Sequence, residues 1–237
     1  PQMTNEAIMR RIRRLSIGVM TLVLFLTWAA SGEARRLKDQ SGREVEVPDN
    51  PVRVVSLAPS VTEIIFALGE GERLKGVTQQ CDFPLEAASL PKVGSFVHPD
   101  LEKIAALEPD LCILARDGNP RIAIERFDAL KIPVYAVNPS NLVTVMDALL
   151  EIGELLNAGQ KARDQVKEMS ARIERVKNRV AEARQGPTVF FQIGVVPIVS
   201  VGTNTFIHEI ITTAGGRNLA EGATPYPRFG REQVLAL

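Results

Sequence analysis

Cysteine and histidine are scarce in this sequence of 237 residues, which contains two of each. Two cysteines, Cys81 and Cys112, are too few for a disulfide framework, and Cys112 stands in an apolar run that is typical of a buried strand. We therefore predict two separate thiols. A metal site needs three or four converging His, Asp or Glu side chains, and the loops do not supply such a set. We predict neither a metal site nor a resident cofactor.

An excess of charge of either sign is also missing. The 28 basic residues equal the 28 acidic residues, and no block of one sign follows the first residues of the chain. A nucleic-acid-binding surface requires a stripe of lysine and arginine, so we predict no nucleic-acid partner. The apolar fraction of 45% is that of an ordinary globular protein, and the length fits one or two α/β domains.

Sequence motifs of catalysis are absent as well. The chain has no G-x-S-x-G nucleophile elbow, no H-E-x-x-H zinc motif, no phosphate-binding loop and no C-x-x-C pair. We predict a protein that is not an enzyme and has no catalytic residue. The remaining enzyme hypothesis is a secreted hydrolase with Cys81 as its nucleophile. A cysteine–histidine pair needs a third, orienting group, and the sequence does not identify one.

Long hydrophobic runs are limited to a single stretch near the N-terminus. Residues 15–30 are predominantly apolar; they follow four arginines between positions 10 and 14 and precede the small residues Gly32 and Ala34. This arrangement predicts a secretory signal peptide over residues 1–34, and hence export to the periplasm. The run is shorter than the ~20 residues that a membrane span requires, so an uncleaved anchor is the less favoured alternative.

The longest periodic signal is the helical run from Asn141 to Arg184. Between residues 160 and 183 its apolar residues recur in alternating steps of four and three, which is one narrow face of a helix. Gly159, after Asn157, suits a left-handed helix stop, so we predict two successive helices. We interpret residues 140–186 as a rigid helical connector; a short coiled coil is the alternative.

The segments on both sides of this connector alternate short β-branched runs with helical patterns, which predicts a parallel sheet with helices on both faces. In the first segment, residues 35–139, Ser60 and Glu63 form an S-x-x-E capping box at a helix start. A polar lead-in with a short strand at 45–47 precedes these elements. We expect strands at residues 52–57, 74–78, 110–115 and 133–137, and helices at 60–68, 100–107 and 121–130.

The last segment, residues 187–237, carries fewer strands. We expect strands at 188–192 and 197–201, and helices at 205–214 and from 229 onward. One or two strands cannot cover the faces of their own helices, so we predict that this lobe is incomplete in the chain. The fold class that follows is α/β, with two Rossmann-like lobes joined by a long rigid helix.

Aromatic side chains gather in the loops at the carboxyl ends of the predicted strands, which form the binding site in α/β lobes. Phe83, Phe96, Tyr226 and Phe229 lie in such loops, and Arg116 follows the strand at 110–115. Aromatic faces with a few polar groups suit a cleft for a large, planar and partly apolar ligand. For each aromatic residue, packing beneath its own loop is the alternative.

A set of short segments outside the connector points to a known class of proteins. They are VVSLAPSVTE at 54–63, GVT at 76–78 with CDFP at 81–84, VGSF at 93–96 with LE at 101–102, LEPDL at 107–111, YP at 226–227 and REQVLA at 231–236. This set resembles the helical-backbone class of periplasmic binding proteins, which deliver metal chelates to ABC importers. Within that class, the last two segments resemble the cobalamin-binding members.

The resemblance implies two α/β lobes joined by a rigid helix, with a corrinoid held in the cleft between them. It implies that Phe96 and Tyr226 stack on the corrin and that Ser60 touches it. Gln80 and Ile193 stand where cobalamin binders have aromatic residues, so the expected ligand is cobalamin or a related corrinoid. The expected ligand-binding residues are Ser60, Gln80, Phe96, Arg116, Ile193 and Tyr226.

The partner that the resemblance implies is the pair of permease subunits of an ABC importer. Glu102 and Glu232, one in each lobe, match two glutamates that meet arginines on the transporter. Simple solvation of a helix is the alternative for Glu102. An exposed ion pair contributes only about 0–1 kcal/mol, so the expected role is orientation and encounter rate. We expect the binding protein to be a monomer.

A haem or iron-siderophore carrier of an ABC importer is the alternative within the same class. His98 lies in a loop, where it can ligate iron, and Arg116 can pair with ligand carboxylates. His208 lies on a helix face beside Ile207 and Ile211, so we predict a structural role for it.

Overall fold

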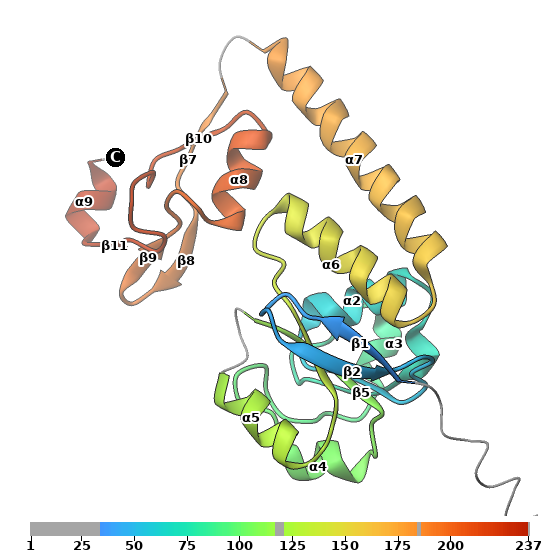
Figure 1. The fold of residues 1–237 in the computed structure, drawn as a ribbon. Helices are drawn as coiled ribbons and strands as arrows, with labels where there is room; N and C mark the ends of the chain where they lie inside the picture. The colour runs from blue at the N-terminus through green and yellow to red at the C-terminus, as the bar shows by residue number, and fades with distance from the viewer. Residues whose placement is uncertain (1–33, 117–120, 184–185, 237) are drawn as a thin grey trace, which may run out of the picture.

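The computed structural model of the chain describes residues 34–116, 121–183 and 186–236. Figure 1 shows two α/β lobes joined by one long helix, as the sequence predicts. None of the helices in these ranges is long and apolar enough to cross a membrane. The predicted signal peptide, residues 1–34, lies outside the described residues except for Ala34.

A four-stranded parallel sheet is the centre of the first lobe. Its strands run in the order β4-β3-β5-β6, and each neighbouring pair is parallel. Parallel neighbours need crossover connections, and helices supply them here. The predicted parallel sheet is therefore confirmed. The strands are β3 (Val54–Ser56), β4 (Leu74–Val77), β5 (Leu111–Ala115) and β6 (Val134–Val137).

Helices cover both faces of this sheet because successive side chains of each strand point to opposite faces. Val54 and Ile113 belong to one core, together with residues of α2 and α6. Val55 and Cys112 belong to the other core, together with residues of α4 and α5. The helices of this lobe are α2 (Pro59–Ala67), the 3-10 helix η1 (Gly71–Arg73), α3 (Leu85–Ala88), α4 (Leu101–Ala106), α5 (Arg121–Ala129) and α6 (Leu142–Leu155).

The two thiols lie in different places and are not joined. Cys112, in the centre of β5, is fully buried and free. Its burial, together with the nearby charge of Asp110, raises the pKa of the thiol. Cys81 is also buried and free, so the predicted pair of separate thiols is confirmed.

A β-hairpin covers the edge of the sheet at β6. Its second strand confirms the short strand expected at residues 45–47, whereas its first strand was expected to be part of a polar lead-in. Its strands are β1 (Ala34–Lys38) and β2 (Glu44–Pro48), paired antiparallel. The Gln40 N–H donates to the Ala136 carbonyl oxygen at 3.0 Å. The Arg43 guanidinium donates to the Val134 carbonyl oxygen at 2.8 Å. These bonds satisfy backbone groups on an edge strand, which would otherwise be open to pairing with another chain.

Asp39 holds the turn of this hairpin through a buried carboxylate. Its side chain has no solvent exposure, and it accepts hydrogen bonds from the Ser41 hydroxyl at 2.7 Å and the Arg43 guanidinium at 2.8 Å. Burial by itself would raise the pKa of Asp39. The hydrogen bonds from Ser41 and Arg43, with the charge of Arg43, outweigh burial and hold the pKa below its ordinary value.

The predicted connector is a helical hairpin in which the second helix joins the lobes. α6 packs on the first lobe and buries Leu149 and Ile152 in its core. α7 (Gly159–Ala181) then runs back beside α6 and continues past it toward the second lobe (Figure 1). The predicted break is confirmed, but the left-handed residue is Asn157, with a φ of 58°, and Gly159 already belongs to α7.

Two predicted helix starts are wrong. α2 begins at Pro59 with Ala58 as its N-cap, and no side chain caps it, so the predicted capping box at Ser60 does not form. Proline at the first helical position fixes the backbone angle there and has no N–H to satisfy. In the second lobe, the helix predicted from residue 229 begins at Arg231, because Phe229 pairs in a strand.

The second lobe is built on short strands in two small sheets. One has the order β11-β9-β8 and is antiparallel, while β10 and β7 pair in parallel. The prediction of a parallel sheet is therefore wrong for the larger sheet of this lobe, because a tight β8–β9 hairpin connects its strands. The strand expected at 197–201 is present, and the one expected at 188–192 is divided into β7 and the start of β8. The elements are β7 (Thr188–Val189), β8 (Gln192–Val195), β9 (Ile198–Ser200), α8 (Phe206–Thr213), β10 (Arg217–Asn218), β11 (Arg228–Phe229) and α9 (Arg231–Leu235).

Asp39→Asn should destabilise the fold by about 2 kcal/mol at pH 7, because it removes a buried charged acceptor of several hydrogen bonds. The folded pKa of Asp39 lies below the unfolded one. The contribution of the Asp39 carboxylate to the free energy of unfolding is therefore fully present above the unfolded pKa of about 4. This contribution is lost as the pH falls through the folded pKa. Urea unfolding curves of wild type and variant, followed by circular dichroism, should therefore converge as the pH falls through the folded pKa.

Asp49→Asn is the matched control, because Asp49 is an exposed acid that follows the same hairpin. It should change the free energy of unfolding by less than about 0.5 kcal/mol. An unfolding difference between wild type and Asp39→Asn that stays constant at every pH would contradict the role assigned to the Asp39 charge.

Candidate functional site

The carboxyl ends of the four parallel strands meet along one edge of the first-lobe sheet, where ligands bind in sheets of this kind. Ser60 follows β3 and is exposed in the first turn of α2. Arg116 directly follows β5 and is exposed. The backbone N–H of Arg116 donates to the Val137 carbonyl oxygen at 2.8 Å, which joins this residue to the end of β6.

Gln80 and Phe96 come together although they lie 16 positions apart in the chain. The Phe96 N–H donates to the side-chain oxygen of Gln80 at 2.9 Å. The Phe96 ring is half-buried and packs against the core that contains α2. Gln80 therefore supports the loop that carries Phe96, a role that its sequence position does not reveal.

A buried polar cluster that the sequence analysis missed lies beneath this edge. The Thr62 hydroxyl donates to the Ser56 hydroxyl at 2.8 Å and lies 3.2 Å from the Cys81 sulfur. The Thr78 hydroxyl lies 3.1 Å from the same sulfur. These side chains are almost completely shielded from solvent. The cluster joins α2 to β3 and to the segment after β4, and so holds the loops at the sheet edge.

The position of Cys81 bears on the hydrolase hypothesis. Cys81 is 1% exposed, and its recorded hydrogen-bond partners are the hydroxyls of Thr62 and Thr78 rather than a histidine. A nucleophilic thiol needs access to the substrate and an adjacent base. The geometry at Cys81 therefore does not support nucleophilic catalysis.

Ile193 and Tyr226 come from the second lobe. Ile193 lies in β8 and is 47% exposed, and Tyr226 precedes β11 and is 59% exposed. The Ser200 N–H donates to the Pro227 carbonyl oxygen at 3.0 Å, which holds the Tyr226 segment beside β9. Both predicted residues thus belong to the surface around the three-stranded sheet.

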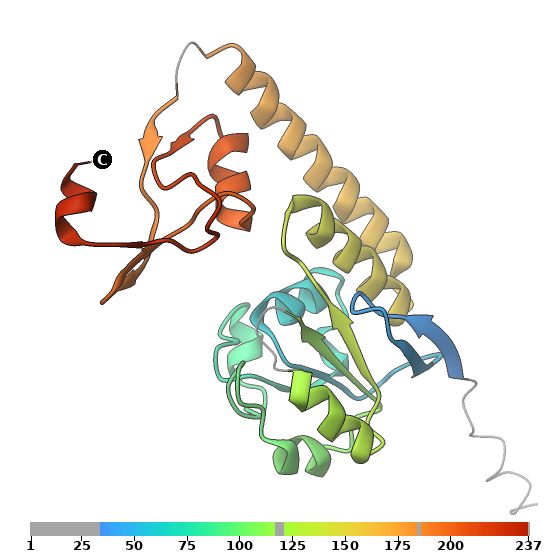
Figure 2. The same ribbon diagram turned by 60° about the vertical axis from the view of Figure 1, so that its left-hand side comes forward.

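The two lobes meet where α8 approaches the start of α6. Figures 1 and 2 both show α8 as the part of the second lobe that lies nearest to this helix. The Glu209 carboxylate of α8 accepts a hydrogen bond from the Leu142 N–H at 2.8 Å. Leu142 is the first residue of α6, and a helix N-terminus favours a negative charge. A charged side chain of one lobe is therefore bonded to the backbone of the other.

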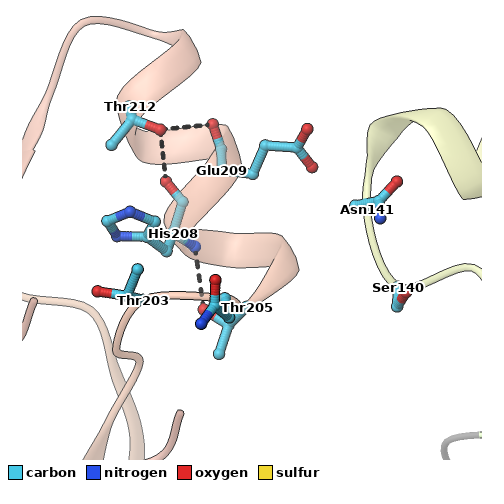
Figure 3. A pocket seen from close by; sticks show the side chains of 8 residues that line it. Ser140, Asn141, Thr203, Thr205, His208, Glu209 and Thr212 are labelled. Atoms are coloured by element: carbon cyan, nitrogen blue, oxygen red, sulfur yellow. Dashed lines mark hydrogen bonds between the residues drawn. The ribbon is translucent and has the colours of Figure 1, made fainter. Parts of the chain in front are cut away.

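Beside this contact lies a pocket of about 440 Å³, here named the inter-lobe pocket. Figure 3 shows Ser140 and Asn141 of the first lobe on one side, and the side chains of α8 and of the loop before it on the other. None of the six predicted ligand-binding residues lines it. Its lining residues are Ser140, Asn141, Thr203, Asn204, Thr205, His208, Glu209 and Thr212.

His208, in the wall of this pocket, is oriented by Asn218. The Asn218 amide nitrogen donates to the Val201 carbonyl oxygen at 2.8 Å and lies 3.1 Å from His208 Nδ1. The side-chain oxygen of Asn218 accepts a hydrogen bond from the Ala220 N–H at 3.1 Å. This bond distinguishes the oxygen of the Asn218 amide from its nitrogen. Nδ1 of His208 is therefore the acceptor, and its ring proton is assigned to Nε2. This bonding agrees with the predicted structural role of His208.

Glu102 and Glu232, the predicted transporter-docking residues, lie in different lobes. Glu102 is in the first turn of α4 and Glu232 in the first turn of α9, and both are exposed. The dipole of each helix stabilises a negative charge at this position. Each glutamate thus has a local structural role in addition to the predicted one.

The periplasmic binding protein family matches residues 54–236 of the chain, which include both lobes and the helical hairpin. The chain belongs to this family. Its members are binding proteins and not enzymes, which agrees with the prediction from the missing catalytic motifs.

A curated relative gives the match in more detail. The vitamin B12-binding protein of Yersinia pestis (strain Pestoides F) is 30% identical to the chain over 184 residues. The aligned region is 77% of this chain and 65% of the relative. The chain therefore spans 65% of the length of this relative.

Two solved structures have a similar fold. The periplasmic vitamin B12 binding protein of Vibrio cholerae gives a TM-score of 0.69 at 27% identity, over 80% of this chain and 74% of that one. A periplasmic heme binding protein from Pseudomonas aeruginosa gives 0.74 at 26% identity, over 78% of this chain and 68% of that one. The fold alone therefore does not decide between these ligands.

Cys81 and Cys112 should each react with iodoacetamide at least ~100-fold more slowly in the folded chain than in urea, because the buried thiols become accessible only through unfolding. Mass spectrometry of proteolytic fragments measures the two rates separately. Rapid and selective alkylation of Cys81 in the folded chain would instead identify an accessible, activated thiol and support the hydrolase hypothesis.

Proposed function

We propose that this chain is an exported substrate-binding protein that captures cobalamin or a related corrinoid between its lobes and delivers it to an ABC importer. The observation that carries the proposal is the 30% identity to a vitamin B12-binding protein over 184 residues. The arrangement of two lobes joined by α7 agrees with capture of a ligand between them (Figure 1).

Phe96 and Tyr226 suit this function because each lobe contributes one of them. Tyr226 is more than half exposed, so a flat ligand that stacks on it removes apolar surface from water. A ligand that stacks on both side chains gains the free energy of this apolar burial on each of its two faces. A dissociation constant of ~10 nM would correspond to about −11 kcal/mol.

The other proposed ligand-binding residues refine the expected ligand. Gln80 bonds to the loop of Phe96, and Ile193 presents an exposed aliphatic side chain. Neither side chain offers an aromatic face. In this protein, stacking on the ring of the ligand therefore depends mainly on Phe96 and Tyr226. A corrinoid other than cobalamin is therefore part of the proposal. Ser60 and Arg116 complete the proposed set from the first lobe.

A haem or iron-siderophore carrier is the second candidate, and the similarity to the heme binding protein of Pseudomonas aeruginosa favours it. His98 is exposed, and its backbone N–H donates to the Ser95 hydroxyl at 3.0 Å, so the loop is held while the imidazole ring is available as an axial ligand of iron. Arg116, exposed at the end of β5, suits a carboxylate of haem.

The proposed cellular role follows from the whole chain. Residues 1–34 act as a cleaved signal peptide, and the protein works in the periplasm as a monomer. Residues 35–139 form the first lobe, 140–186 the connector, and 187–237 belong to the second lobe. Glu102 and Glu232 contact the permease subunits.

Calorimetric titration with cyanocobalamin and with haem tests the ligand. Cyanocobalamin should bind the wild type. Phe96→Ala and Tyr226→Ala should each weaken binding by about 10-fold, because each removes an aromatic face that contributes on the order of 1–2 kcal/mol. Phe83→Ala is the matched control and should bind as the wild type does, because Phe83 lines a separate pocket with Phe66 of α2.

Tight binding of haem without any binding of cyanocobalamin would contradict the corrinoid proposal and support the second candidate. In that case His98→Ala should remove the shift of the haem Soret band that iron ligation produces.

Replacement of both Glu102 and Glu232 by alanine should leave ligand affinity unchanged and abolish uptake by cells that carry the importer, because the two side chains are exposed and face a partner. The control is the pair Glu44→Ala and Glu182→Ala, two exposed glutamates outside the proposed contact. Calorimetry and uptake of labelled ligand are measured on the same variants. A loss of affinity in the first pair would show that these glutamates face the ligand.

A further inference from the structure

The inter-lobe pocket lies beside the space in which we propose that the ligand binds. Its first-lobe residues, Ser140 and Asn141, follow β6 and therefore lie at the same sheet edge as Ser60 and Arg116. Its other wall belongs to α8 and the loop before it (Figure 3). A volume of about 440 Å³ fits one edge of a tetrapyrrole and not the whole molecule.

Among the residues that the structure describes, the lining of this pocket is rich in hydrogen-bonding groups and includes no lysine or arginine. Asn141 and Asn204 offer amide groups, and the threonines offer hydroxyls. The Nδ1 atom of His208 is assigned as the acceptor of a hydrogen bond from Asn218. Glu209 is the carboxylate among the lining residues that the structure describes.

Glu209 is held in place at the junction of the lobes. Its carboxylate accepts a hydrogen bond from the backbone N–H of Leu142 at 2.8 Å. Glu209 also lines a groove between α6, α7 and α8, together with Glu174 and Lys177 of the connector. There Lys177 is paired with Glu174 at 2.9 Å, so this pair adds no net charge.

We propose that the inter-lobe pocket receives an uncharged, amide-bearing edge of the ligand and disfavours an edge that carries a carboxylate, with Glu209 as the residue that sets this preference. The inference rests on the proposed function and adds a basis for ligand choice. Corrinoids are fringed by amide groups, whereas haem carries carboxylates. An amide can donate a hydrogen bond to Glu209 or to the asparagine oxygens. A carboxylate placed there meets a like charge in a partly desolvated pocket.

The test uses two pairs of ligands that differ in carboxylate charge: cyanocobalamin with its monocarboxylic acid, and haem dimethyl ester with haem. The affinity ratio of the neutral to the charged member is measured within each pair, on the full chain. The control Glu182→Gln should give the same ratio as the wild type. In Glu209→Gln the ratio should fall by about 10-fold, because glutamine keeps the size of the side chain and its acceptor oxygen but removes the charge.

The outcomes separate this inference from the proposed function. An unchanged ratio in Glu209→Gln overturns the inference, whichever pair binds. Binding of the haem pair alone overturns the corrinoid proposal, while the ratio within that pair still decides the role of Glu209. A wild type that binds neither pair overturns both.

A second measurement distinguishes an effect of the Glu209 charge on the affinity ratio from an effect of a loosened contact between the lobes. Hydrogen exchange at the Leu142 amide should be the same in Glu209→Gln as in the wild type, and faster in Glu209→Ala, which loses the acceptor. A lowered ratio with unchanged exchange supports the inference. A lowered ratio with accelerated exchange in Glu209→Gln would assign the effect to the loosened lobe contact and overturn the charge-based account.

Discussion

A close contact between α6 and α7 sets the geometry on which the rest of the molecule depends. A Cβ atom added to Gly153 of α6 would lie 2.4 Å from the Cβ atom of Ala162 in α7, a distance that no pair of side chains can adopt. Only glycine lets the two helices approach this closely. The left-handed turn at Asn157 reverses the chain between them. Together these features fix the direction in which α7 leaves the first lobe.

The direction of α7 in turn decides where the second lobe lies. α7 has 23 residues and is therefore about 35 Å long, more than the width of the sheet on which α6 packs. The second lobe is attached through this helix and again through the bond from Leu142 to Glu209. Two attachments restrict rotation more than one flexible loop does, so we expect the space between the lobes to change little when a ligand enters.

The sequence predicts what is encoded locally and fails where distant residues act together. The apolar run of β5 and the helical periodicity of α7 are local signals, so these elements, the parallel sheet and the sheet-edge position of Ser60 and Arg116 were predictable. The pairing of β1 with β2 was not predictable, because the hairpin is held against β6 by bonds between residues far apart in the chain, such as Arg43 and Val134. The contact of Glu209 with Leu142 spans 67 positions and leaves no pattern in either segment. Gln80 matches a ligand-contact position by resemblance, while its bond to the Phe96 backbone appears only in the fold.

The N-terminal hairpin also has a consequence for the order in which the chain folds. Arg35 donates a hydrogen bond to the carbonyl oxygen of Glu154, 119 positions later, and Gln40 donates to the carboxylate of Glu151, 111 positions later. Contacts across such separations form only after the intervening chain has been made, and they slow folding. The hairpin at the start of the described chain can therefore be fixed in position only after α6 has formed. For the export that we propose, the leading segment can therefore enter a membrane channel before these contacts hold it in the fold.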